Sequence, residues 1–179
     1  MIPKKMEAAF NEQIKHELES AYIYLAMAAY FEDQGLDGMA RWMRAQTQEE
    51  VTHAMRFYKH IAERGGRVKL HALAEPPADY SSPLAAFEGA LEHERFITGT
   101  INELVKLGRE ENDYASESLL QWFVDEQVEE EETAGRVVQQ LKVVSGDGRG
   151  LLMIDRELAT RNFVLNPELA GLFAQGPAQ

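Results

Sequence analysis

The chain has 179 residues, with 30 Asp and Glu against 18 Lys and Arg, and it contains no cysteine. This length suits one domain, and 45% hydrophobic residues against 27% charged residues exclude a disordered chain. The absence of cysteine excludes disulfide scaffolds, Cys-ligated zinc, iron–sulfur clusters and thiol nucleophiles. Any metal site in this protein must therefore use oxygen and nitrogen ligands.

The charge and hydropathy patterns also restrict partners and location. A net charge of −12 repels phosphate backbones, so we expect no nucleic-acid partner and regard cations as the more natural ligands. The N-terminal residues become charged at Lys4, without the apolar stretch of a secretory signal. The longest apolar run, residues 21–31, has 11 residues, fewer than the ~20 that span a bilayer. We therefore expect a cytoplasmic protein with no membrane partner.

Long segments rich in Ala, Leu, Glu and Lys follow one another along the chain, separated by a few Gly, Pro and Asn-Asp positions. They predict helices at about residues 5–34, 37–64, 83–110 and 113–145, and a short fifth helix near 150–161. Ser82 before Pro83 is a typical helix start, because Ser can cap free amides and Pro loses no hydrogen bond at the first helical position. No segment shows the alternation of a strand.

The lengths of the connections indicate how these helices are arranged. Short links join the first helix to the second and the third to the fourth, so each pair should form an antiparallel hairpin. The link over residues 65–82 reaches about 59 Å when extended, more than the ~42 Å of a 28-residue helix. The sequence therefore predicts an all-α four-helix bundle with one long crossover loop and a short fifth helix, over residues 1–161. We expect the tail, residues 162–179, to be partly flexible.

Each long segment carries a stripe of residues, spaced by threes and fours, that should face the interior of the bundle. Polar residues interrupt every stripe near its middle. The third stripe consists of Phe87, Leu91, Glu94, Thr98, Ile101 and Val105. The polar residues on the other three stripes are Glu17 and Tyr24, then Gln46, Glu50 and His53, and then Gln127 and Glu130.

These interruptions lie at one height in the predicted bundle. Counted from the first hairpin turn at Gly35, Glu17 lies 18 residues back and His53 lies 18 residues forward. Glu94 lies 17 residues before the second turn near Glu111. Adding 77 to positions 17, 50 and 53 gives 94, 127 and 130, so the simplest interpretation is two copies of one helical hairpin that share a polar level.

Four carboxylates at one level of an apolar bundle would be costly, because unpaired charges are desolvated and like charges repel. No Lys or Arg lies on the stripes, and proton sharing could remove only part of the cost. Carboxylate oxygens together with the imidazole of His53 suit two divalent transition-metal ions. Glu50 and His53, three residues apart on one helix, can grip one ion, while a carboxylate can bridge to a second. We interpret the level as a paired-metal site.

Three neighbouring features leave alternatives open. Gln127 either ligates a metal or only donates a hydrogen bond to a ligand or water. Tyr24, two turns after Glu17 on the same face, is core packing, a hydrogen-bond partner of a ligand or an electron donor to the metals. The acidic run 129–132, with Glu126 and Glu49 beside it, is either a solvated face or an additional cation site.

The motifs around these residues resemble the ferritin family, and within it the haem-free prokaryotic ferritins, over about residues 3–165. They are Asn11-Glu12-Gln13 leading to Glu17, Gln48-Glu49-Glu50-x-x-His53, Tyr80-Ser81-Ser82, His93-Glu94, and the run from Gln121 to Glu131. The resemblance implies that Glu17, Glu50 and His53 ligate one iron, and Glu50, Glu94 and Glu130 the second, with Gln127 nearby. It also implies a third iron site at Glu49, Glu126, Glu129 and Glu130. A ferritin is a hollow shell of 24 subunits that oxidises Fe(II) with O₂ or peroxide and stores a ferric mineral.

Related families resemble the chain less well. Bacterioferritins carry a second Glu-x-x-His where this chain has Gln127-x-x-Glu130, and a haem-ligating Met where Thr52 stands, so we expect no haem. Rubrerythrins add a Cys-rich module that a chain without cysteine cannot supply. Two other functions remain open: a di-metal oxidase acting on an organic substrate, and a non-enzymatic helical interaction protein whose polar level only sets helix register.

Overall fold

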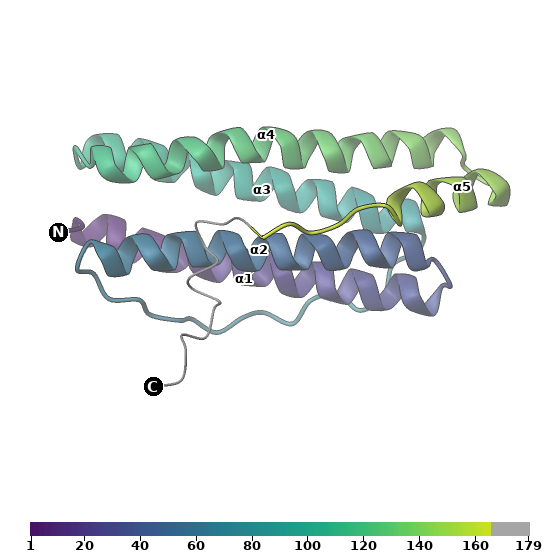
Figure 1. Ribbon diagram of the computed structural model, residues 1–179, viewed down its shortest axis with the longest axis horizontal. Coiled ribbons are helices and arrows are strands. Elements are labelled where there is room, and N and C mark those ends of the chain that lie inside the picture. The colour runs from purple at the N-terminus through teal and green to yellow at the C-terminus, as the bar shows by residue number, and fades with distance from the viewer. Residues whose placement is uncertain (166–179) are drawn as a thin grey trace.

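The computed structural model describes residues 1–165 and contains five helices in that range, with no strand. Four long helices form a bundle: α1 (Lys4–Asp33), α2 (Asp37–Glu63), α3 (Pro83–Glu110) and α4 (Tyr114–Val143). The short helix α5 (Gly148–Leu158) follows α4 at one end of the bundle and packs against α2 (Figure 1). The predicted all-α four-helix bundle with a short fifth helix is confirmed.

Local capping explains where the later helices begin. The Ser82 hydroxyl accepts a hydrogen bond from the amide of Ala85 at 3.1 Å, with Pro83 in the first turn, as predicted. The Asp113 carboxylate caps α4. Asp147 accepts a hydrogen bond from the amide of Arg149, so α5 begins two residues earlier than predicted and ends at Leu158 instead of residue 161.

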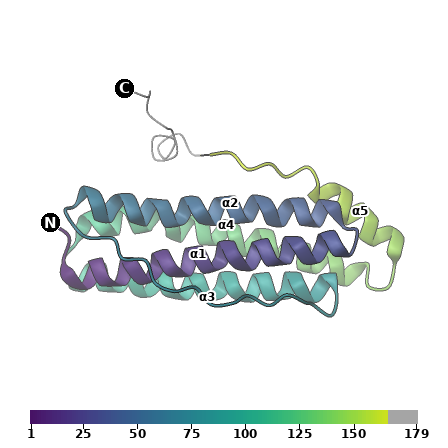
Figure 2. The same ribbon diagram turned by 90° about the horizontal axis from the view of Figure 1, so that it is seen from below.

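The long connection between α2 and α3 returns along the bundle beside α1 (Figure 2). Asn11 holds it there, because its side chain donates to the carbonyl of Arg67 at 3.1 Å and accepts from the amide of Lys69 at 2.7 Å. Further along, the amide of Ala74 donates to Glu19 at 3.0 Å. This crossover makes α2 and α3 run in the same direction, while each hairpin is antiparallel (Figure 1).

Two apolar clusters fill the bundle, one toward each end, and the predicted polar level lies between them. The cluster near α5 contains Phe31, Met39 and Phe87, whereas the other contains Phe10 and Phe57. Apolar packing above and below therefore removes the polar level from water, which raises the cost of any unpaired charge there.

The predicted stripe of α3 is only partly correct. Phe87, Glu94 and Ile101 are buried, but Leu91, Thr98 and Val105 are half-buried. Ala90, Ile97 and Leu104 are buried in their place. The buried residues still follow one stripe with spacings of three and four, but the two spacings alternate in the opposite order to the predicted one.

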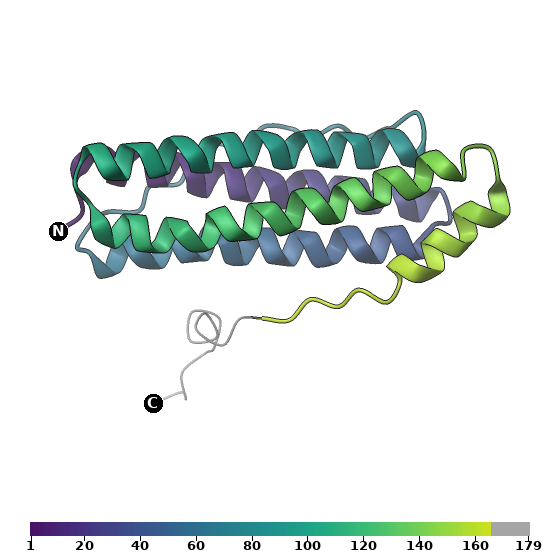
Figure 3. The same ribbon diagram turned by 90° about the horizontal axis from the view of Figure 1, so that it is seen from above.

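The chain after α5 runs beside α2 (Figure 3). Arg41 donates to the carbonyl of Arg161 at 3.2 Å and to the side chain of Asn162 at 2.5 Å. The rest of the predicted tail, residues 166–179, lies outside the described residues. Within residues 1–165, no helix has an apolar stretch that could cross a membrane.

Candidate metal centre

The four long helices bring the predicted polar residues together at the middle of the bundle. Each of these residues is at most 5% exposed. They are Glu17 from α1, Glu50 and His53 from α2, Glu94 from α3, and Gln127 and Glu130 from α4. The residue spacing predicts that these polar residues share one level of the bundle, and the structure shows this arrangement.

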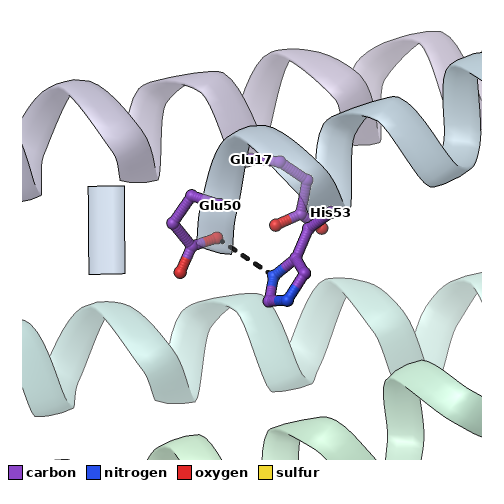
Figure 4. Close-up of side chains that lie close together, drawn as sticks. All are labelled: Glu17, Glu50 and His53. Carbon is purple, nitrogen blue, oxygen red and sulfur yellow. Dashed lines mark ion pairs between the residues drawn. The ribbon is translucent and has the colours of Figure 1, made fainter. Parts of the chain in front are cut away.

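Glu17, Glu50 and His53 form the first group of candidate ligands. One ligand atom from each lies within 4.8 Å of the others, and their polar ends point toward α3 (Figure 4). His53 Nδ1 lies 3.4 Å from Glu50 Oε2 because the two residues are one helical turn apart on α2. Glu17 Oε2 is buried and has no hydrogen-bond partner. A buried acceptor without a partner beside an imidazole fits a divalent cation, which would satisfy it.

Glu94 and Glu130 supply carboxylates from the other hairpin. The Tyr24 hydroxyl donates to one oxygen of Glu94, and Gln127 Nε2 donates to the other at 3.2 Å. Glu130 also belongs to a second group, in which His53, Glu126 and Glu130 each place a ligand atom within 4.8 Å of the others. The imidazole of His53 therefore lies near carboxylates of both hairpins.

Burial raises the pKa of all four buried carboxyl groups. It raises the pKa of Glu17 to about 8, with the nearby charge of Glu50 adding to the effect. The pKa of Glu130 also rises to about 8, by burial and by the charge of Glu94, and that of Glu50 rises well above its usual range for the same reasons. Burial raises the pKa of Glu94 to about 7, against the hydrogen bond from Tyr24. The metal-free centre therefore retains protons near neutral pH that metal ions must displace.

Two glutamines support this centre, and the sequence alone assigned them no role. Gln13 Nε2 donates to Glu17 Oε1 at 2.9 Å, and Gln46 Nε2 donates to Glu130 Oε2 at 2.7 Å. The signal was present, because Gln46 lies on the second stripe and Gln13 lies one turn before Glu17. Tyr24 makes the hydrogen bond that was one of its three predicted roles.

A second group of carboxylates surrounds a pocket of about 370 Å³ between α2 and α4, near the end of α5. We call it the acidic pocket. It contains the four residues of the predicted third site, Glu49, Glu126, Glu129 and Glu130. Glu130 thus links the pocket to the buried centre. Burial also raises the pKa of Glu126, and the nearby His53 opposes this rise.

The acidic pocket also contains cationic side chains that the stripes did not predict. Arg136 and Arg161 line it, and Arg161 Nη2 lies 2.5 Å from Glu49 Oε2. The spacing of residues along the four long helices carries no information about Arg161. This residue follows α5 and reaches the pocket only because α5 packs against α2.

Comparisons with known proteins agree with this geometry. Residues 7–144 match the family described as Ferritin-like domain. The chain is 41% identical over 161 residues to the bacterial non-haem ferritin of Bacteroides fragilis strain 638R, which covers 90% of this chain and all of that protein. It is 36% identical over 163 residues to the bacterial non-haem ferritin of Staphylococcus aureus strain MRSA252, covering 91% of this chain and 98% of that one.

A solved structure supports the same assignment. The open-pore ferritin from the hyperthermophilic archaeon Archaeoglobus fulgidus superposes with a TM-score of 0.90 at 50% identity, covering 90% of this chain and all of the other. Sequence, fold and the buried carboxylate–histidine level thus agree, and the chain belongs to the ferritin family.

Proposed function

We propose that the chain oxidises Fe(II) with O₂ or peroxide between its four long helices and stores the Fe(III) as a mineral inside a shell of 24 copies. As a non-haem ferritin, the chain is an iron-storage protein with ferroxidase activity. The observation that carries this function is the buried level of Glu17, Glu50 and His53, with the carboxylates of the other hairpin beside it.

In the proposed centre, Glu17, Glu50 and His53 hold one iron ion, and Glu50, Glu94 and Glu130 hold the other. The mutual distances in the first group and the unpartnered oxygen of Glu17 support this assignment. Two bound Fe(II) ions supply one electron each to the oxidant. A pair of ions is suited to this transfer because both electrons leave from one site.

The protein's own groups prepare and hold this centre. Carboxyl groups with raised pKa values release protons as cations arrive, so the arriving positive charge is partly offset. Gln13 and Gln46 hold Glu17 and Glu130 by hydrogen bonds, and Tyr24 and Gln127 hold the two oxygens of Glu94. We propose that Gln127 acts through Glu94, and that Tyr24 orients Glu94 and is also the candidate electron donor.

We propose the acidic pocket as a third iron site, formed by Glu49, Glu126, Glu129 and Glu130. Its contact with the centre supports this role, because Glu130 belongs to both and His53 Nε2 lies 3.9 Å from Glu126 Oε1. Iron leaving the centre through Glu130 would meet the carboxylates of this pocket first.

We propose a 24-subunit assembly in the cytoplasm, of about 485 kDa (24 × 20.2 kDa). Large apolar side chains on the bundle surface support assembly: Tyr22 is 45% exposed and Leu25 is 49% exposed on α1, and Leu73 is 42% exposed on the crossover. Light scattering of the purified protein tests the stoichiometry, and a stable monomer at micromolar concentration would contradict it.

Iron loading in air tests the function. Protein given Fe(II) should turn amber and keep hundreds of irons per particle in solution, with no haem absorption. Stoichiometric Fe(II) binding without mineral would favour the di-metal oxidase. The acidic pocket beside the centre is lined mainly by carboxylates and arginines, so it suits a cation better than an organic substrate. Failure to bind Fe(II) would favour the helical interaction protein.

A further inference from the structure

Arg161, three residues after the end of α5, places its guanidinium in the acidic pocket. Its Nη2 lies 2.5 Å from Glu49 Oε2, and its Cζ lies 4.7 Å from the centre of the Trp42 ring. The side chain is 22% exposed. A guanidinium that combines an ion pair with a cation–π contact is held in place more firmly than an ordinary surface arginine.

The backbone around Arg161 is held against α2 as well. Arg41 donates to the carbonyl of Arg161 and to the side chain of Asn162. On the other side, Asp155 of α5 accepts a hydrogen bond from the amide of Met39 at 2.9 Å. Contacts before and after Arg161 in the chain therefore hold this residue at the acidic pocket.

A metal ion in the acidic pocket and the guanidinium of Arg161 would compete for the same carboxylates. Arg161 already pairs with Glu49, which is one of the four proposed ligands, and it lines the same pocket as the other three. A second cation entering the pocket is repelled by the guanidinium and finds Glu49 already paired.

We propose that Arg161 is a tethered cation that competes with metal ions for the acidic pocket and sets their affinity there. Occupation of the pocket by metal then displaces Arg161 and loosens residues 159–165 from α2. This inference rests on the proposed third iron site. Losing an ion pair of this exposure together with a cation–π contact should change the binding constant of a metal ion for the acidic pocket by roughly five- to thirty-fold.

Terbium(III) titration of the assembled, metal-free protein tests the proposal. Trp42 lines the pocket and can sensitise Tb(III) luminescence there. Glu129→Gln identifies the pocket signal, because Glu129 is not among the proposed ligands of the buried pair. Arg161→Gln should tighten Tb(III) binding in that signal roughly five- to thirty-fold. Arg161→Lys keeps the charge and should stay closer to wild type than Arg161→Gln. The matched control Arg156→Gln removes one charge from an exposed position on α5 and should change the affinity by less than about twofold.

Cleavage by trypsin after Arg161 provides a second readout that does not depend on luminescence. Tb(III) should speed release of the 162–179 peptide from wild type, and Glu129→Gln should remove this acceleration. If Glu129→Gln leaves Tb(III) binding unchanged, the third site itself is wrong. If Glu129→Gln weakens binding but Arg161→Gln behaves like Arg156→Gln, the third site stands and the competing role of Arg161 is refuted.

Discussion

Replacing Glu17 by Gln should stabilise the metal-free protein, because the wild-type fold holds this carboxyl in a site that resists its ionisation. The substitution keeps nearly the same volume. The oxygen of the new amide can still accept the hydrogen bond from Gln13, which reaches one carboxylate oxygen of Glu17, while the other oxygen has no partner to lose. The substitution replaces the ionisable oxygen by an amide NH₂ group, which stays neutral at every pH of the experiment.

The magnitude follows from the pKa of Glu17, which rises from 4.5 to about 8. Between these values the native state binds more protons than the unfolded state, so the free energy of unfolding falls as pH rises. Because pH 7 lies 2.5 units above the ordinary pKa, the free energy of unfolding of wild type is lowered by about 3 kcal/mol at this pH. Glu17→Gln has no ionisable group at this position, so its free energy of unfolding is not lowered in this way. Its melting temperature should exceed that of wild type by roughly 6–12 °C at pH 7, and the difference should vanish near pH 4.

Calorimetry of the metal-free protein at several pH values measures this effect, with light scattering confirming that both proteins are in the same assembly state. Glu12→Gln is the matched control, because Glu12 is exposed on the same helix and should show no comparable gain. Zn(II), which is redox-silent, should stabilise wild type by about 2.7 kcal/mol per site at a hundredfold excess over Kd and should stabilise Glu17→Gln less. A metal-free Glu17→Gln protein that is no more stable than wild type at pH 7 would show that polar partners already satisfy the Glu17 carboxyl. It would refute the claim that this carboxyl destabilises the metal-free fold.

Three further perturbations follow from the same structure. Glu50→Ala and His53→Ala should abolish fast Fe(II) oxidation in stopped-flow traces, whereas Glu129→Ala should mainly alter later turnovers. An equal loss of the first phase in all three variants would contradict the division into a buried centre and a separate acidic pocket. Tyr24→Phe removes a hydrogen bond that lowers the pKa of Glu94, so the pH midpoint of Zn(II) binding should move upward, and an unchanged midpoint argues against this orienting role. Gly38→Ala would place a Cβ 1.7 Å from the carbonyl oxygen of Asp155, so α5 should lose its docking on α2 and urea unfolding should show a loss of at least about 2 kcal/mol. Gly99→Ala, which meets no atom within 4 Å, should instead be neutral or stabilising by about 0.5–1 kcal/mol, and similar losses in the two variants would show that the contact with α5 is not the cause.

Much of the bundle could be predicted because helix geometry repeats. The 3.6-residue period and the equal distances from the hairpin turns were enough to place Glu17, Glu50 and Glu94 at one level. Ser82 and Pro83 marked a helix start through chemistry that is local in sequence. The same period did not resolve the buried face of α3, because spacings of three and four can alternate in either order, and Ile97 and Leu104 are buried where Thr98 and Val105 were predicted.

Other features depend on contacts between distant residues and could not be predicted from spacing. The ion pair between Arg161 and Glu49 joins residues 112 positions apart and requires α5 to approach α2 closely at Gly38. The partners of Gln13 and Gln46 depend on side-chain conformations that a stripe does not specify. The acidic run 129–132 left a solvated face and an additional cation site open, and the family resemblance specified the third site, whose residues lie partly off the core stripes.

Anomalous diffraction at the iron edge, from crystals soaked anaerobically with Fe(II), tests the central claim most directly. We expect two strong peaks inside the bundle, one bounded by Glu17, Glu50 and His53 and the other by Glu50, Glu94 and Glu130. Both peaks should disappear in Glu50→Ala crystals, because Glu50 contributes to both sites. Iron bound only at the surface, or no iron between the helices of wild-type crystals, would contradict the assignment of this level as the ferroxidase centre.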